Sequence, residues 1–416
     1  GSGNNAGDGY IIAGLLANRG IEVSVGLVGK RPDLASDSGK AYEYCNKMGV
    51  KILTAKESMK GSTFIVDALL GTGLKNDVRP DYLEVISAVN QSQCFVFSVD
   101  LPSGLCADTG KILGASIKAN ITVTFIGRKL GLLTNEGSEM AGKLYFNDLS
   151  LPESLFEAVE TRIKMLRYED EVKKLPTRHK NAHKSAHGHV LVVGGNQGMA
   201  GAAMMAAEAA LYSGAGVVSL ATHPLNVGAL ISRRPEVMTR GVNTAKELKS
   251  MLTKATTVVL GPGLGNDLDW GSNLFNEAIK SKVPMVLDAD ALTRLSNQSI
   301  KVKKKSNWIL TPHPGEARSL LGKDAQENRL VAVEQIQEMY GGICLLKGAG
   351  TLIASSNAVW LCAYGSPAMS VAGMGDVLSG VIGGLVAQGL EIDDSACLGA
   401  AVHSLAADHI VSRQGE

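Results

Sequence analysis

Short apolar runs alternate with helical stretches along most of this 416-residue chain. Apolar runs of about four to eight residues, bounded by glycine or polar residues, are typical of strands buried on both faces of a parallel sheet. The expected strands are residues 21–28, 121–125, 190–193, 257–260 and 343–346, and two further short strands are expected to open residues 64–74 and 94–104 before glycine turns. The expected helices are residues 10–17, 202–211, 377–386 and 397–410. This repeated order predicts doubly wound α/β folds.

The chain is long enough for two domains, each with its own core. Residues 151–178 interrupt the pattern, because charged residues and the prolines Pro152 and Pro176 replace the apolar runs. We expect a first domain over residues 1–155, a linker over 156–178 and a second domain over 179–416. The first nine residues form a glycine-rich stretch of the kind that follows a strand, so we expect the natural first domain to begin before Gly1.

The composition is that of a globular protein, with 45% hydrophobic and 19% charged residues. The 41 basic and 40 acidic residues give a net charge of +1, which offers no electrostatic case for nucleic acid or an anionic membrane. No apolar stretch approaches the roughly 18 residues of a membrane-spanning helix. Six cysteines without CxxC spacing are typical of reduced thiols, so we expect a cytoplasmic protein.

The most informative stretch lies at residues 371–384, where glycines, an acid and a helix start meet. Gly373 and Gly375 allow the backbone to approach a ligand, and the first N–H groups of the following helix would face an anion. A carboxylate beside phosphate repels it, so Asp376 fits this place mainly if it takes a proton from a hydroxyl group or holds a metal. The alternative is an ordinary glycine turn in which Asp376 caps the helix.

Further loops in the second half follow buried strands, at residues 261–265, 287–291, 311–316 and 345–351. In open α/β sheets ligands bind at the carboxyl edge of the strands, so these loops predict one assembled site. Lys347, before a glycine turn, is placed to meet nucleotide phosphates, and a surface lysine is the alternative. His313 lies between two prolines that hold the chain extended, and Glu316 would cap the next helix. A glycine-rich turn at residues 194–201 is weaker evidence for nucleotide binding.

Oxygen-bearing side chains lie beside glycines in the first half as well. They are Asn4, Asn5, Asp8, Asp67, Asp100 and Ser103, and most of them are expected at strand ends. Such oxygens are ligands for hard cations and partners for polar substrates. Residues 129–133 form a loop that would close over a ligand.

Four histidines lie close together in the sequence, namely His179, His183, His187 and His189. Their spacing fits no tetrahedral metal motif with thiolates. We therefore expect a solvated linker that passes into a ligand-facing loop.

The motifs of the second half resemble those of the ribokinase-like ADP- or ATP-dependent NAD(P)H-hydrate dehydratases. They are Gly261-Pro-Gly-Leu-Gly265, Thr311-Pro-His-Pro-Gly-Glu-Ala317, Lys347-Gly-Ala-Gly-Thr351 and Gly373-Met-Gly-Asp376. The resemblance implies that the hydrated nicotinamide substrate meets Ala202, Gly263, His313 and Asp376. It implies that the nucleotide, ADP or ATP with Mg²⁺, meets Lys347, Gly348, Ala349, Gly350, Thr351 and Gly375. The chain stops at Glu416, where this family usually continues into a short closing segment.

The first half, to about residue 150, resembles the Rossmann-like NAD(P)H-hydrate epimerase domain, also called the YjeF N-terminal domain. The family's Asn-Asn-Gly-Gly-Asp loop is present as Asn4-Asn-Ala-Gly-Asp8, and the methyl group of Ala6 departs from it. The resemblance implies substrate contacts from Asn4, Asn5, Ala6, Gly7, Asp8, Gly71, Thr72, Gly73, Leu74, Lys75, Asn76, Asp77 and Asp100. It also implies K⁺ ligands at Asn5, Asp67 and Ser103, and oxygen donors of this kind suit such a cation without selecting potassium.

Together the resemblances imply a bifunctional repair enzyme for NADHX and NADPHX, the hydrated forms of NADH and NADPH. The first domain would interconvert the R and S epimers, with Asp100 as proton shuttle, and the second would dehydrate the S form. Because hydroxide is a poor leaving group, Asp376 would deprotonate the ring hydroxyl for attack on the terminal phosphate, and phosphate would then leave. We expect small-molecule partners and a homo-oligomer.

Two other interpretations remain open. A ribokinase-like small-molecule kinase would use the same turn and release a phosphorylated product. The first half would then be a non-catalytic binding module, although the joint presence of Asn5, Asp67, Asp100 and Ser103 favours catalysis. The sequence does not distinguish ADP from ATP, or NADHX from NADPHX.

Overall fold

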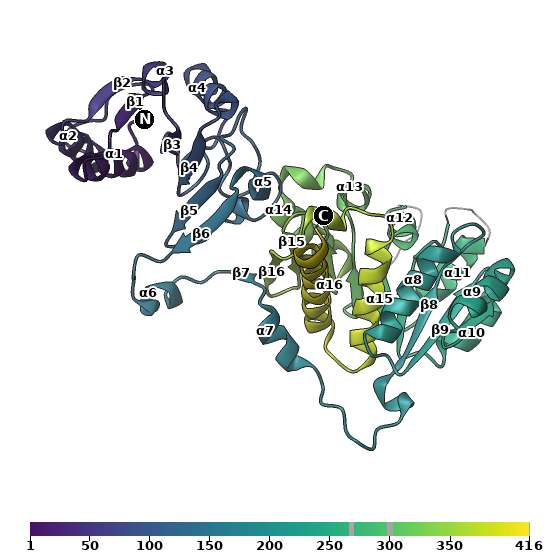
Figure 1. Cartoon of the computed structure of the whole chain (residues 1–416). Coiled ribbons are helices and arrows are strands. Elements are labelled where there is room, and N and C mark those ends of the chain that lie inside the picture. Colours follow the sequence, from purple (N-terminus) through teal and green to yellow (C-terminus); the bar gives the residue numbers. More distant parts are fainter. Residues whose placement is uncertain (266–269, 298–302, 416) are drawn as a thin grey trace. The chain divides into compact units, whose positions relative to one another are not determined.

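The computed structural model describes residues 1–265, 270–297 and 303–415. The chain divides into two compact units, Gly1–Glu160 and Thr161–Glu416, which are drawn in purple to blue and in teal to yellow in Figure 1. Each unit has its own sheets and its own buried core.

The first unit contains two sheets whose strands are parallel. One sheet has the order β3 (Phe64–Asp67), β4 (Phe95–Val99), β5 (Ile121–Phe125) and β6 (Lys143–Asn147), and the other pairs β1 (Ser24–Leu27) with β2 (Lys51–Thr54). The helices are α1 (Asn4–Asn18), α2 (Asp37–Lys47), α3 (Ala55–Ser58), α4 (Pro80–Gln91), α5 (Gly137–Met140) and α6 (Glu153–Glu157), with a 3-10 turn η1 at Leu130–Leu132.

The start of the chain differs from the expected loop, because α1 begins at Asn4 rather than near Tyr10. Glycine is a poor helix former, but α1 packs closely on α2. A Cβ atom at Gly7 would lie 3.2 Å from the Cα atom of Ser38, so a small residue is needed at this contact. Tertiary packing therefore outweighs local propensity here.

The second unit is built on a ten-stranded sheet. Its order is β10 (Met238–Gly241), β9 (Val217–Thr222), β8 (His189–Val193), β11 (Thr257–Leu260), β12 (Met285–Leu287), β13 (Trp308–Leu310), β14 (Ile343–Leu346), β15 (Thr351–Ala354), β16 (Val359–Cys362) and β7 (Ile163–Met165). The strands from β10 to β14 are parallel, and β15 is antiparallel to both of its neighbours, β14 and β16. The side chains of β11, β12, β13 and β14 are all buried, as continuous apolar strands require.

Three helices pack side by side over this sheet, namely α8 (Ala200–Tyr212), α15 (Met374–Ala387) and α16 (Ile392–Gln414), and Figure 1 shows them in front of the strands. Helices α10 (Ala245–Leu252), α11 (Trp270–Ala278), α12 (Asp290–Leu295), α13 (Pro314–Leu321) and α14 (Arg329–Tyr340) contact one another in succession. The shorter elements are α7 (Tyr168–Glu171), α9 (Val227–Arg233), η2 (Val172–Lys174), η3 (Lys184–His187), η4 (Pro224–Asn226), η5 (Ala325–Glu327) and η6 (Pro367–Met369).

The stretch expected as a linker, residues 156–178, contains regular structure. β7 pairs in parallel with β16 through Ile163, Lys164 and Met165, and α7 contacts α16. Residues from Thr161 onward therefore belong to the second unit. The apolar pattern does not reveal this strand, because it lies at the sheet edge and places the exposed Lys164 between its two apolar residues.

Candidate active sites

Backbone contacts join two of the predicted loops at the carboxyl edge of the second sheet. After β8, Gly195 N donates to Pro262 O at 3.0 Å and Asn196 N donates to Gly263 O at 2.6 Å. A Cβ atom at Gly194 would lie 2.0 Å from Pro262 O, so this approach requires glycine. The glycine-rich turn at 194–201 thus supports the 261–265 loop.

The start of α15 lies at the same edge. Gly373 occupies the N-cap with a φ of +92°, a left-handed conformation, and Asp376 lies in the first helical turn. A Cβ atom at Gly375 would lie 3.0 Å from Lys347 Nζ and 3.6 Å from Asp288 Oδ2. The structure therefore brings together Asp376, Gly375 and Lys347, although Lys347 is distant from the other two in the sequence.

Lys347 is part of a buried ion pair. Its Nζ lies 2.9 Å from Asp288 Oδ1 and 3.8 Å from Glu316 Oε2, and the Asp288 side chain is 1% exposed. Burial disfavours the ammonium, but Asp288 and Glu316 outweigh this effect and raise the pKa of Lys347. The surface-lysine alternative is therefore wrong, and Lys347 is a fixed positive charge at the strand ends.

Two acids around this lysine have pKa values raised toward neutral pH. Burial raises the pKa of Asp376 to about 6, with Asp288 acting in the same direction and Lys347 opposing it. Burial also raises the pKa of Glu316 to about 7. A general base with a pKa near the working pH is the arrangement that proton transfer favours.

His313 and Glu316 form a reciprocal cap at the start of α13. The Nδ1 atom of His313 accepts from Gly315 N at 2.9 Å and Glu316 N at 3.2 Å, while a Glu316 carboxylate oxygen accepts from His313 N at 2.7 Å. Burial and the charge of Lys347 lower the pKa of His313. The expected capping role of Glu316 is confirmed, although the helix begins at Pro314, and the same carboxylate also faces Lys347.

The remaining predicted residues of this half fall into two places. Gly263 and Ala202 are neighbours, because a Cβ atom on Gly263 would lie 3.3 Å from the Ala202 methyl group. Gly348, Ala349 and Gly350 form the turn between β14 and β15, and Thr351 is the first residue of β15.

Three residues around this site escape sequence reasoning. Asp288 pairs with Lys347, Asp290 Oδ2 accepts from Gly265 N at 2.8 Å, and the buried Arg329 donates to the carbonyls of residues 346, 347 and 350. Between the two acids, Ala289 has a φ of +47°, which is strained for a non-glycine residue. The Asp-Ala-Asp motif after β12 is the available signal, but its position alone assigns no role. Arg329 carries no signal, since it lies within a helix.

In the first unit, the side chains of Asn5, Asp67 and Ser103 meet around Leu70. Asn5 Nδ2 donates to Leu70 O at 3.0 Å, Ser103 Oγ accepts from Leu70 N at 2.9 Å, and Asp67 accepts from both the backbone and the side chain of Ser103. Burial raises the pKa of Asp67, although hydrogen bonds from Ser103 and Ser98 oppose this. A monovalent cation beside these oxygens would offset the burial of the carboxylate, so the donor set fits K⁺.

The expected substrate residues of this unit have different surroundings. Ala6 is 5% exposed and packs in the core between α1 and α2. Gly71 lies against Asn5, because a Cβ atom on Gly71 would lie 3.1 Å from Asn5 Cβ. Lys75 forms an exposed pair with Asp108 at 3.0 Å. Thr72, Gly73, Leu74, Asn76 and Asp77 lie in the same connection between β3 and α4.

Asp100 follows β4 with a φ of +65°. Its Oδ1 atom accepts from Phe125 N and Thr124 Oγ1, each at 3.1 Å, and from Lys129 Nζ. The nearby Asp8 of α1 has a raised pKa, first through burial and second through the charge of Asp100. The sequence predicts Lys129 only as part of a closing loop, and its ion pair with Asp100 is a finding of the structure.

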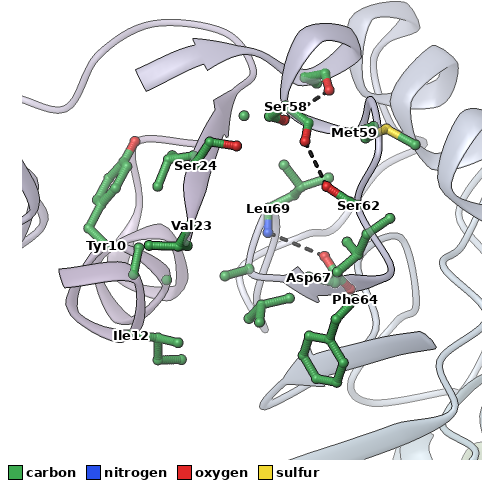
Figure 2. Close-up of a pocket in the computed structure, with 18 of the residues that line it drawn as sticks. Tyr10, Ile12, Val23, Ser24, Ser58, Met59, Ser62, Phe64, Asp67 and Leu69 are labelled. Atoms are coloured by element: carbon green, nitrogen blue, oxygen red, sulfur yellow. Dashed lines mark hydrogen bonds between the residues drawn. The ribbon is translucent and has the colours of Figure 1, made fainter. Parts of the chain in front are cut away.

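A cavity of about 260 Å³ lies in the first unit between β1 and β3. Figure 2 shows Tyr10 and Ser24 on one side and Phe64 and Asp67 on the other. The lining is mainly apolar; of the predicted site residues it includes Ala6 and Asp67 but neither Asp100 nor residues 71–77. We therefore do not assign this cavity to the substrate.

Within residues 1–265, 270–297 and 303–415, His, Cys, Asp and Glu side chains form no group of three or more suited to hold a metal ion. His189, the last of the four clustered histidines, instead faces Lys254 O at 3.1 Å and Ser219 Oγ at 2.7 Å. Over the same described ranges, no helix combines the length and the apolar character needed to cross a membrane.

The open sheet of the second unit, with an acid-bearing helix start facing a buried lysine–aspartate pair, defines an enzyme with a ribokinase-like fold joined to a second α/β unit. Comparison with known families is consistent with both halves. A family described as NAD(P)H-hydrate dehydratase matches residues 190–416, and one described as YjeF-related protein N-terminus matches residues 1–131. The chain belongs to the family of bifunctional NAD(P)H-hydrate repair enzymes.

Relatives of this name are similar over the whole chain. The bifunctional NAD(P)H-hydrate repair enzyme Nnr of Coxiella burnetii is 44% identical over 422 residues, covering 100% of this chain and 86% of the relative. The enzyme of the same name from Escherichia coli is 39% identical over 420 residues, covering 100% and 80%. The family predicted from the motifs is therefore confirmed.

Solved structures confirm the fold of the second unit. A ribokinase-like superfamily protein from Enterococcus faecalis V583 has a TM-score of 0.58 at 26% identity, covering 61% of this chain and 90% of that chain. The ADP/ATP-dependent NAD(P)H-hydrate dehydratase from Bacillus subtilis, co-crystallized with ATP/Mg²⁺, has a TM-score of 0.55 at 24% identity, covering 61% and 92%. The expected α/β fold class is correct.

Proposed function

We propose that the first unit interconverts the R and S epimers of NADHX and NADPHX, and that the second unit dehydrates the S form with ADP or ATP. The observation that supports the second activity best is the first turn of α15, where Asp376 lies beside the Lys347–Asp288 pair. A base, a fixed cation and free helix N–H groups are what transfer of phosphate to a hydroxyl group requires.

Each group has a separate task in this proposal. Asp376 removes the proton from the ring hydroxyl, which then attacks the terminal phosphate of the nucleotide. Lys347 and the N–H groups at the start of α15 stabilise the charge on the transferred phosphoryl group, and the turn at residues 348–351 holds the nucleotide. Elimination of phosphate then restores the dihydronicotinamide ring. Mg²⁺ bound to the nucleotide would offset the charge of its phosphates. The Bacillus subtilis dehydratase of similar fold was co-crystallized with ATP/Mg²⁺.

In the first unit we propose K⁺ at Asn5, Asp67 and Ser103, and substrate at residues 4–8, 71–77 and Asp100. A cation held by these residues would supply a positive charge beside bound substrate, and Asp100 moves the proton. The oxygen donors around Leu70 support this assignment. We further propose a cytoplasmic homo-oligomer, in keeping with six cysteines that all remain unbridged.

The direct test is to incubate the purified chain with hydrated NADPH and ADP, and then with ATP, while following the absorbance of the restored dihydronicotinamide. We expect stoichiometric inorganic phosphate. Accumulation of a phosphorylated product without recovery of absorbance would identify a small-molecule kinase instead.

Asp376→Asn tests the role of the base. The amide is nearly isosteric but accepts no proton, so dehydration should fall by about 10²–10⁴-fold while nucleotide binding, measured by calorimetry, is retained. Near-normal turnover would remove Asp376 from the mechanism.

A further inference from the structure

The ammonium group of Lys129 is fully engaged at the carboxyl end of β5. It donates to Asp100 Oδ1, to Thr124 Oγ1 at 3.0 Å and to Phe125 O at 2.9 Å. An ammonium has three donors, so these contacts use all of them. The side chains of Lys129 and Asp100 are only 18% and 21% exposed, so the pair is shielded from screening by water and salt. Lys129 therefore serves its neighbours rather than a ligand.

The two carboxylate oxygens of Asp100 have different hydrogen-bonding surroundings. Oδ1 receives all three hydrogen bonds, from Lys129, Thr124 and Phe125 N, whereas no donor in the described part of the chain reaches Oδ2. The backbone of Asp100 is also held in the left-handed region, with its N–H donating to Val123 O at 2.7 Å. A strained backbone conformation of this kind persists where the surrounding structure holds the residue in place, and such residues cluster at functional sites. One oxygen is thus anchored and the other is free.

We propose that Lys129 is the positioning residue of epimerisation, which anchors one oxygen of Asp100 so that its free oxygen exchanges protons with the hydrated ring. This inference rests on the epimerase activity proposed for the first unit. It goes beyond that proposal by naming a positioning residue and the oxygen of Asp100 that carries the proton.

The chemistry balances without an oxidant. Hydration of an enamine places the hydroxyl group on the carbon bonded to the ring nitrogen. Protonated Asp100 gives a proton to this hydroxyl, the C–O bond breaks, and water leaves as the nitrogen lone pair forms a C=N bond. Water then adds to the opposite face, its surplus proton returns through solvent to the Asp100 carboxylate, and the C=N electron pair returns to nitrogen.

The test compares Lys129→Met with Lys129→Arg, using pure R epimer without nucleotide and chromatographic detection of the S epimer. We expect Lys129→Met to lose about 10²-fold in rate. The loss should fall on kcat, with KM for the R epimer little changed, because Lys129 anchors Asp100 and does not itself hold the substrate. Lys129→Arg, which keeps a cationic donor beside Asp100, should recover part of the rate.

Two controls separate this role from damage to the fold. Lys118→Met removes an exposed ion pair with Glu139, 2.6 Å long, from the same unit and should leave epimerisation unchanged. Dehydration of pure S epimer reports the second unit in every variant. A loss that appears in KM as much as in kcat, with no rescue by arginine, would leave Lys129 with a structural role only and overturn the inference, as would full activity of Lys129→Met. Absence of epimerisation in the unmutated chain would overturn the proposed function of the first unit together with this inference.

Discussion

At the scale of single residues, the dehydratase site depends on the protonation of Asp376, whose pKa is raised to about 6. The base acts in its ionised form, so activity should be present above this pKa and lost as the pH falls through it. We expect kcat/KM for dehydration to fall about tenfold per pH unit below about pH 6. A profile measured with saturating nucleotide and limiting S epimer checks this.

Glu316 complicates the same profile, because its pKa is raised to about 7 and both acids face Lys347. The observed midpoint therefore belongs to the coupled group of acids. Glu316→Gln would remove one titration and leave a single acid limb. Activity that stayed flat to about pH 5 in that variant would contradict the role of Asp376.

The sequence predicts those site residues whose position within a motif already indicates a chemical role. Asp376 follows glycines at a helix start, and Lys347 precedes a glycine turn. Asp288 and Arg329 escape such reasoning, because their roles arise from partners 59 and 18 residues away along the chain. The role of Lys129 is hidden for the same reason, since pairing with Asp100 spans 29 residues.

At the scale of elements, α15 depends on glycine to pack against α8. A Cβ atom at Gly380 would lie 2.1 Å from Ala206 O, which is backbone and cannot rotate away. Gly380→Ala should therefore cost about 1–3 kcal/mol or more through overpacking, despite the better helix propensity of alanine. We expect the melting temperature of the second unit to fall by several degrees in calorimetry.

Gly228→Ala is the matched control, because Gly228 lies in α9 and a Cβ atom there meets nothing within 4 Å. The same substitution should stabilise the unit by about 0.4–1 kcal/mol. If the two alanine substitutions changed the stability equally, helix propensity rather than the close packing of α15 would determine their effect.

The elements recovered from sequence are those with an unambiguous burial pattern. The predicted limits of 121–125, 257–260 and 343–346 coincide with β5, β11 and β14, because well-buried strands leave continuous apolar or β-branched runs. The structure differs at α1 and β7 for opposite reasons. Glycines make the first turns of α1 (Asn4–Asn18) look like a loop, although packing on α2 stabilises them, and a charged residue obscures the edge strand Ile163–Met165.

At the scale of the whole molecule, the candidate residues of each activity lie within one unit. We therefore predict that Asp100→Asn blocks epimerisation and leaves dehydration of the S form intact. A racemic mixture with excess nucleotide should then be repaired quickly to about half and afterwards only at the spontaneous rate. The extent and the rate of absorbance recovery measure this.

The unmutated chain provides the reference for that experiment. Complete single-phase repair by Asp100→Asn, where the unmutated chain shows epimerase activity, would exclude Asp100 as the acid–base group. Loss of both activities would show that the division of labour between the units is wrong.

The cavity between β1 and β3 has a consequence for hydrogen exchange in the first unit. In the described first unit β1 pairs only with β2, and β3 only with β4, so each strand turns one edge of peptide groups toward the cavity. Amides on such edges exchange their hydrogens with solvent sooner than those of central strands such as β4.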